Sequence, residues 1–206
     1  SILPQKIQKL VMTVENLHGL QEVRMKINRP IILCVDSEEK ILNYDATQED
    51  LRTVMQRISN YSLYAFEEEI KQGFITIRGG HRVGICGKCV IEDNKIKTIK
   101  NIGSINIRVS REILGCSDKL MPFLIEGEQV LNTIIISPPK CGKTTILRDI
   151  ARNISTGMRA FKFSGKKVCI IDERSELAAC YDGVPQMNVG IRTDVLDNCL
   201  KSEGIM

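Results

Sequence analysis

The stretch Ser137-Pro138-Pro139-Lys140-Cys141-Gly142-Lys143-Thr144-Thr145 decides the fold class of this 206-residue chain. It matches the phosphate-binding P-loop pattern G-x-x-x-x-G-K-[ST], with Ser137 in place of the first glycine. In that pattern the backbone N–H groups of the loop and of the helix that follows it form one concavity that suits phosphates. The sequence therefore predicts a nucleotide site built from residues 137–145.

Individual residues of the loop have separate expected tasks. Gly142 lets the backbone approach the phosphates closely because it has no side chain. Lys143 is expected to reach the β- and γ-phosphates, and Thr144 to offer its hydroxyl to Mg²⁺. Thr145 is expected to face the sheet. A chance match is disfavoured because the motif follows an apolar run and opens an amphipathic helix, which is the context that the motif requires.

The residues around the loop predict an α/β domain, which we place at 117–206. The apolar run Val130–Ile136 is expected to be a buried strand that leads into the loop, and Lys167–Asp172 to be a second one after the helix. Strand, loop, helix and strand in this order form a βαβ unit with a parallel sheet. Ser117 is expected to cap a short helix before the first strand.

Residues 1–112 are typical of a smaller α+β domain. An amphipathic helix is expected over 4–17, and Thr47 with Asp50 forms a capping box for a second helix. Strands in this part, and a third helix at 65–71, follow from apolar alternation and turn residues. The expected strands are two within 20–35, then 74–78, 82–91, 95–100 and 104–109.

Composition excludes several classes of protein. With 43% hydrophobic and 26% charged residues the chain has the balance of a folded protein, and it contains no apolar run of about 18 residues that would span a membrane. The N-terminus has no signal-peptide core, so we expect a soluble cytoplasmic protein whose eight cysteines are reduced thiols. A net charge of only +4 and the absence of Trp disfavour nucleic-acid binding.

The pair Asp172-Glu173 ends an apolar strand and is the second candidate group. It has the form of a Walker B strand, in which Asp holds the metal and Glu polarises the attacking water. The alternative is a buried strand with a solvated polar end. Only one helix and one return strand separate this pair from Lys143, which is early for Walker B.

Three other features carry weaker signals. Cys86 and Cys89 have C-x-x-C spacing, but no second ligand pair accompanies them, which favours structural thiols over zinc. The turn Gly79-Gly80-His81-Arg82 is either simple hairpin chemistry or a basic loop that faces the nucleotide or a neighbouring subunit. Arg108 and Arg192 are candidates for stabilising charge on the γ-phosphate.

Four separated motifs resemble the stage III sporulation protein AA family. They are Ile136–Asp149, Asp172–Leu177 with Gly183–Gln186, Gly79–Gly87 and Arg192–Asp197. This family is similar to the hexameric ATPases of type II and type IV secretion. The resemblance implies a RecA-like P-loop domain beside the smaller N-terminal domain, with ATP and Mg²⁺ as ligands and Lys143 and Glu173 as catalytic residues.

In such ATPases Glu173 would polarise water from an acidic box, and the Walker B strand would follow one strand later. Family members continue past a segment like 201–206 into that strand, so the P-loop domain is expected to be truncated here and this chain to hydrolyse ATP weakly or not at all.

The intact protein is expected to be an ATPase that forms a hexameric ring. On the resemblance it energises a sporulation export or channel complex and reaches the membrane through those channel proteins. The alternative is a nucleic-acid-dependent P-loop NTPase. A small-molecule kinase would need an acceptor site, which the sequence does not reveal.

Overall fold

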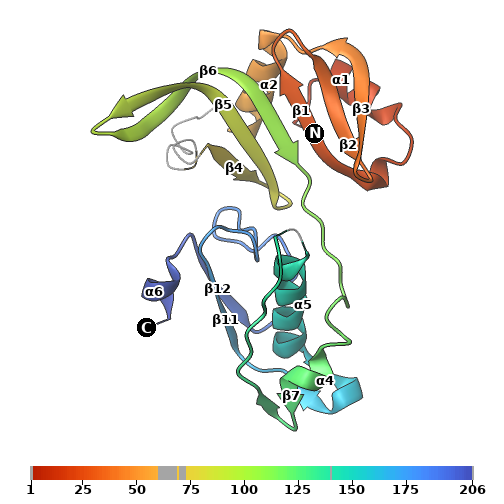
Figure 1. Cartoon of the computed structure of the whole chain (residues 1–206), viewed down its shortest axis with the longest axis vertical. Helices are drawn as coiled ribbons and strands as arrows, with labels where there is room; N and C mark the ends of the chain where they lie inside the picture. The colour runs from red at the N-terminus through yellow and green to blue at the C-terminus, as the bar shows by residue number, and fades with distance from the viewer. Residues whose placement is uncertain (1, 60–68, 70–72, 140, 206) are drawn as a thin grey trace. The chain divides into compact units, whose positions relative to one another are not determined.

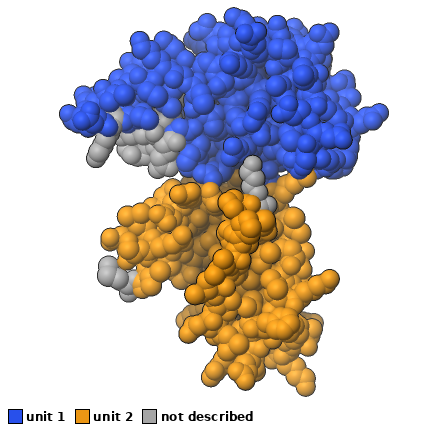
Figure 2. Space-filling model, in the orientation of Figure 1, with its two compact units in different colours: residues 1–77, 81–110 blue, residues 78–80, 111–206 orange. Residues whose placement is uncertain are grey.

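The computed structural model describes residues 2–59, 69, 73–139 and 141–205. The chain divides into two compact units (Figure 2). Unit 1 comprises residues 1–77 and 81–110, and unit 2 comprises residues 78–80 and 111–206. Both units contain helices and strands, so the fold is mixed α/β, as the sequence predicts.

Unit 1 is built on one six-stranded antiparallel sheet with the order β3-β2-β1-β6-β5-β4 (Figure 1). Its strands are β1 Leu20–Lys26, β2 Pro30–Val35, β3 Glu38–Asp45, β4 Phe74–Ile77, β5 His81–Glu92 and β6 Lys95–Arg108. Helices α1 (Gln5–Met12) and α2 (Gln48–Ile58) supply Ile7 and Leu51 to the core, which also contains Leu33 of the sheet. A 3₁₀ turn, Leu17–Gly19, precedes β1.

The predicted capping box at the start of α2 is confirmed. The Thr47 hydroxyl accepts from the Asp50 backbone N–H at 3.2 Å, and the Asp50 carboxylate accepts from the Thr47 N–H at 2.8 Å. Asp50 also accepts from the Tyr44 hydroxyl at 2.8 Å. These bonds satisfy orphan donors at the helix start.

Two strands of unit 1 differ from the prediction. The strand β3 was not expected, because its charged stretch Glu38-Glu39-Lys40 hides the alternation. The two strands expected at 95–100 and 104–109 are one strand, β6, since the long neighbour β5 supplies pairing partners along most of its length. The helix expected at 65–71 lies outside the described residues apart from Glu69.

In unit 2, helix α5 (Lys143–Thr156) follows the P-loop. Strand β11 (Val168–Asp172) pairs in parallel with β12 (Thr193–Asp197), and Ala151 of α5 joins Ile170 in a small core. The remaining elements are α4 Met121–Leu124, β7 Ile125–Glu126, β8 Gln129–Val130, β9 Gly157–Met158, a 3₁₀ turn Arg159–Phe161, β10 Phe163–Ser164 and α6 Lys201–Gly204. In the described part of the chain no helix is both long and apolar enough to cross a membrane.

The strand expected at Val130–Ile136 is wrong for most of its length. Only Gln129–Val130 forms a strand, β8, which pairs with β7. Residues 131–138 form neither helix nor strand, and Ile134 and Ile136 are 85% and 88% exposed. A strand needs a neighbour for its backbone donors and acceptors, and among the described residues no strand pairs with this segment. The parallel pair is therefore β11 with β12.

The expected capping role of Ser117 is also wrong. The N-cap of α4 is Leu120, which makes no side-chain capping bond. Ser117 is fully buried, and its hydroxyl donates to the Asp149 carboxylate of α5 at 2.7 Å. Ser117 thus forms a hydrogen bond with a residue of α5 instead of capping α4.

Candidate functional site

Helix α5 begins at the P-loop, and its N-cap is Gly142. This glycine has φ +79°, in the left-handed region that favours glycine. A Cβ at this position would meet no heavy atom within 4 Å, so backbone conformation rather than crowding by protein atoms requires glycine here. Ser137 does not adopt a positive φ, and replacing the first glycine of the pattern therefore brings no left-handed strain.

The Lys143 side chain lies along the loop that precedes it. Its ammonium donates to the Ser137 carbonyl at 2.6 Å and lies 3.5 Å from the Pro138 carbonyl. These bonds close the loop around the lysine. Lys143 is half-buried at the helix N-terminus, where the backbone N–H groups and the helix dipole favour anions.

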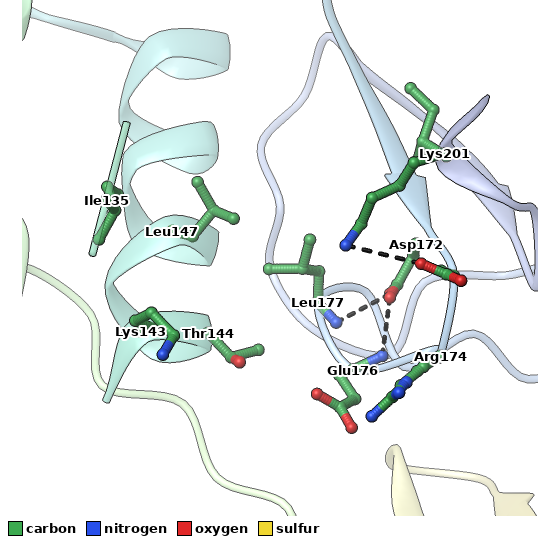
Figure 3. A pocket seen from close by; sticks show the side chains of 11 residues that line it. Ile135, Lys143, Thr144, Leu147, Asp172, Arg174, Glu176, Leu177 and Lys201 are labelled. Atoms are coloured by element: carbon green, nitrogen blue, oxygen red, sulfur yellow. Dashed lines mark hydrogen bonds and ion pairs between the residues drawn. The ribbon is translucent and has the colours of Figure 1, made fainter. Parts of the chain in front are cut away.

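A cavity of about 450 Å³ lies beside this helix start (Figure 3). Lys143, Thr144 and Leu147 of α5 line one side, and the end of β11 with the loop after it lines the other. The full lining is Ile135, Lys143, Thr144, Leu147, Ile171, Asp172, Glu173, Arg174, Glu176, Leu177 and Lys201. Its volume falls within the range of about 300–1,000 Å³ that is usual for small-molecule sites.

The cavity unites only part of the predicted site. Lys143, Thr144 and Glu173 line it, whereas Thr145 lies on another side of α5, beside residues 112–114. Four predicted residues are described but are outside the lining: Ser137, Pro138, Pro139, Cys141. Gly142 contributes the N-cap instead, and Lys140 lies outside the described residues.

Asp172 is committed to the loop that follows it. It is 3% exposed, and its carboxylate accepts backbone N–H groups from three residues. Glu176 donates to Oδ1 at 2.9 Å, and Leu177 and Ala178 donate to Oδ2 at 2.8 and 2.9 Å. A carboxylate with these bonds organises a turn, and it has little remaining capacity to hold a metal.

Glu173 is the carboxylate of the pair that is available to a ligand. Its side chain is 38% exposed, and its nearest cation is the Lys201 ammonium of α6, at 3.6 Å. An exposed ion pair of this kind is worth little in stability, since water screens it. Both side chains line the cavity, so Lys201 is a basic group there that the sequence analysis missed. No spacing rule marks it, because it approaches from a separate element.

Two acidic side chains meet where β11 and β12 end together: Asp172, which is buried, and Asp197, which is half-buried. Asp172 and Asp197 are cross-strand partners in the parallel pair. Burial raises the pKa of the Asp197 carboxyl, and the neighbouring Asp172 carboxylate raises it further. Burial and the same two carboxylates also raise the pKa of the Cys180 thiol to about 11. Cys180 is therefore a neutral thiol near pH 7.

Arg192 has a structural role in the described chain. Its guanidinium donates to the Ser155 carbonyl at 2.8 Å, and its backbone N–H donates to the Ser155 hydroxyl at 2.7 Å. Ser155 is in the last turn of α5, at the end opposite the P-loop. The arginine thus caps the helix C-terminus, where a cation is favoured.

The other candidate residues, Arg108, Cys86 and Cys89, do not line the cavity. Arg108 is exposed at the end of β6, in unit 1. Cys86 and Cys89 are exposed free thiols on β5. Among the described residues no cluster of three or more His, Cys, Asp or Glu side chains could hold a metal ion.

A helix that starts at a P-loop beside parallel strands is typical of P-loop nucleotide-binding proteins. The family model "Sporulation stage III, protein AA" matches residues 1–206, and the chain belongs to this family. It is 44% identical over 207 residues to the stage III sporulation protein AA of Bacillus subtilis. It is also 26% identical over 190 residues to the protein SEEDLING PLASTID DEVELOPMENT 1 of Arabidopsis thaliana. The resemblance read from the four motifs is confirmed.

Solved structures share the fold at low sequence identity. The Legionella pneumophila ATPase DotB has a TM-score of 0.53 at 15% identity, over 95% of this chain and 52% of that one. The pilus retraction motor PilT with bound ADP has a TM-score of 0.50 at 12% identity, over 94% and 50%. The chain spans 66% of the Bacillus subtilis relative, 24% of the Arabidopsis protein and about half of these ATPases.

Proposed function

We propose that the full-length protein is a P-loop ATPase that binds ATP with Mg²⁺ at the cavity beside α5. The observation that carries this proposal is that Lys143, Thr144 and Glu173 line one cavity although Glu173 follows Lys143 by 30 positions in the sequence. These residues supply the three groups that phosphoryl transfer to water needs: a cation for the β- and γ-phosphates, a hydroxyl for the metal and a carboxylate that orients water.

The residues present fit a nucleotide-bound Mg²⁺. Magnesium in such sites takes one or two protein oxygens and fills the rest of its shell with phosphate oxygens and water, and the Thr144 hydroxyl lines the cavity. When bound, the ion neutralises charge that develops on the phosphates. We expect a carboxylate other than Asp172 to hold its water shell, because Asp172 already accepts three backbone N–H groups.

We infer further that the ATPase assembles as a ring, hexameric as in secretion ATPases, and energises an export or channel complex during sporulation. Support comes from the family, whose Bacillus subtilis member is a stage III sporulation protein, and from the shared fold with DotB and with the motor PilT. In this proposal the protein reaches the membrane through its channel partners.

The first test removes the Lys143 ammonium. Lys143→Ala in the full-length protein is expected to lower ATP affinity at least about 10²-fold, because the motif places no other side-chain charge between the phosphates. Calorimetric titration with a non-hydrolysable ATP analogue measures this. Lys119→Ala is the matched control, since Lys119 is an exposed lysine of unit 2 outside the cavity lining.

A second variant separates binding from turnover. Glu173→Gln is expected to bind ATP normally and to release phosphate at least about 10²-fold more slowly, which is the usual scale for losing a positioned base. Unchanged affinity in Lys143→Ala would refute the nucleotide site, and unchanged turnover in Glu173→Gln would refute the role of that carboxylate.

A further inference from the structure

The loop after β11, residues 173–178, is held from both sides of its backbone. On the N–H side, the Asp172 carboxylate accepts from Glu176, Leu177 and Ala178. On the carbonyl side, the guanidinium of Arg148 donates to Leu177 at 2.5 Å through Nε and to Glu176 at 2.8 Å through Nη2. The loop that starts with Glu173 is therefore tied to two separate elements, β11 and α5.

Arg148 is unusual among the arginines of this chain because it is buried. Only 8% of the residue is exposed, and burial lowers the pKa of its guanidinium, while Glu112 and Asp172 act in the opposite direction. A buried guanidinium is costly unless hydrogen bonds satisfy its donors. Besides the two loop carbonyls, it approaches the Arg111 carbonyl at 3.4 Å through Nη1. Planar, forked donors fix the carbonyls in direction as well as in distance.

The position of Arg148 along α5 connects it to the P-loop. Thr144 precedes it by four residues, so the two side chains lie on the same face of the helix, one turn apart. Thr144 lines the cavity, and Arg148 holds the loop that brings Glu173 to the same cavity. One turn of α5 therefore connects Thr144, which lines the cavity, to Arg148, which holds the loop that bears Glu173.

We propose that Arg148 is a positioning residue that keeps the Glu173 loop in register with the P-loop helix. It touches neither nucleotide nor water in this role and acts through the carbonyls of Glu176 and Leu177. The inference rests on the proposed ATPase function. A shift of about 1 Å in a reacting group can cost about 10²-fold in rate, so a loosened loop should impair turnover more than binding.

The chain offers a matched control one turn further along α5. Arg152 is 18% exposed on its side chain, and its guanidinium contacts the Asp149 carboxylate at 2.7 Å. Asp149 in turn accepts from the backbone of Gly115 and Ser117, away from the Glu173 loop. Arg152→Gln therefore removes a similar buried contact from the same helix without touching residues 173–178.

The experiment compares Arg148→Gln, Arg148→Lys and Arg152→Gln in the full-length protein. For Arg148→Gln we expect kcat to fall about 10²-fold while ATP-analogue affinity changes less than about threefold. Arg148→Lys keeps the charge without the fork, so its kcat should lie between those of Arg148→Gln and the wild type. Arg152→Gln should keep kcat near the wild-type value even if its melting temperature falls.

Amide hydrogen exchange gives a readout that does not depend on ATP hydrolysis. The Glu176, Leu177 and Ala178 amides should exchange at least about tenfold faster in Arg148→Gln than in Arg152→Gln or the wild type. If Arg148→Gln does not fold, Arg148→Lys must show the same two changes in smaller measure. Equal loss of kcat in both Gln variants, or unchanged exchange at these three amides, would overturn the positioning role.

The failure of the ATPase proposal itself would look different. In that case the wild type would neither bind nor hydrolyse ATP, yet the exchange comparison would still decide whether Arg148 orders the loop.

Discussion

Two adjacent carboxylates at the end of β11 differ in what their oxygens already bind. Asp172 accepts three backbone N–H groups, whereas Glu173 meets only the exposed Lys201 ammonium among the described residues. Both side chains line the cavity, but backbone N–H groups of the loop occupy the oxygens of Asp172, whereas Glu173 lies in the turn after β11 and its carboxylate faces the cavity with the Lys201 ammonium beside it. Both groups are carboxylates, so their different hydrogen-bond partners, and not their chemistry, make Asp172 structural and leave Glu173 available to a ligand.

The loop-organising role of Asp172 leads to a prediction about stability. Asp172→Asn replaces one accepting oxygen by an NH₂ group, which leaves at least one part-buried backbone N–H of the loop without its present partner. We expect the free energy of unfolding to fall by about 1–3 kcal/mol, the usual cost of such a group, while ATP-analogue affinity stays nearly unchanged. Urea unfolding measures the first quantity and calorimetry the second.

The control for Asp172→Asn is Asp182→Asn. Asp182 is exposed, and its φ of +49° suits Asn as well as Asp. A strong loss of Mg²⁺-dependent affinity in Asp172→Asn, with stability unchanged, would mean that Asp172 is the metal-holding acid of a Walker B strand.

The raised pKa of Asp197 predicts how the stability of the fold depends on pH. Its pKa is higher in the folded chain than in the unfolded one, mainly because the carboxyl is buried. The folded state thus binds this proton more tightly, and stability from this group is greatest below its unfolded pKa of about 3.9 and is lost as pH rises through the folded pKa. Asp197→Asn should therefore unfold at higher urea than the wild type near pH 7.

The pH series supplies the internal check on Asp197. The gap between Asp197→Asn and the wild type should shrink as pH falls through the folded pKa and close below about 3, where the wild-type carboxyl is protonated in both states. Asp194→Asn, on the same strand but exposed, should show no such trend. A gap that is constant with pH would contradict the buried-carboxyl explanation.

Among the elements, local signals predicted some parts well. The α2 capping box follows from Thr47 and Asp50 alone, because a cap needs partners only three residues away. Helix α5 follows from its P-loop and its apolar face. Strand β6 was divided in the prediction because its length depends on β5, which is a tertiary partner.

The segment 131–138 shows where local signals fail. Apolar runs predict burial in a sheet, but a strand exists only where another strand accepts its hydrogen bonds. Likewise, Arg148 and Lys201 reach the site by contacts whose partners are distant in sequence. The motif thus predicted Lys143 and Thr144 at the cavity, whereas the side chains that hold or flank Glu173 required the structure.

The α2 cap provides a test at the scale of an element. Thr47→Ala removes the hydroxyl that accepts the Asp50 N–H, and we expect unfolding to become easier by about 1 kcal/mol. Thr53→Ala, in the interior of the same helix, should be neutral or slightly stabilising because Ala has the higher helix propensity. Urea midpoints followed by circular dichroism distinguish the two. Equal effects of both substitutions would contradict the capping bond.

At the scale of the whole molecule, exposed apolar surface in unit 2 bears on assembly. Ile134 and Ile136 before the P-loop are almost fully exposed, and Phe123 and Ile191 are each 77% exposed. Monomeric proteins seldom leave large apolar groups uncovered when these gather in patches. Of these four residues, Ile134 and Ile136 are close together in the sequence, and we expect neighbouring copies in the proposed ring to cover them.

The last prediction concerns how assembly depends on the nucleotide. If the full-length protein is a ring ATPase, ATP should shift it from smaller species to a closed ring of six copies, because a ligand stabilises whichever state binds it more tightly. Sedimentation velocity with a non-hydrolysable analogue measures the shift. Lys143→Ala should remain in the smaller species, whereas Glu173→Gln, which keeps binding, should assemble as the wild type does.

If the wild type stays monomeric with saturating analogue at its highest soluble concentration, the ring proposal is wrong. Assembly of Lys143→Ala to the same extent as the wild type would instead show that ring formation does not depend on the nucleotide.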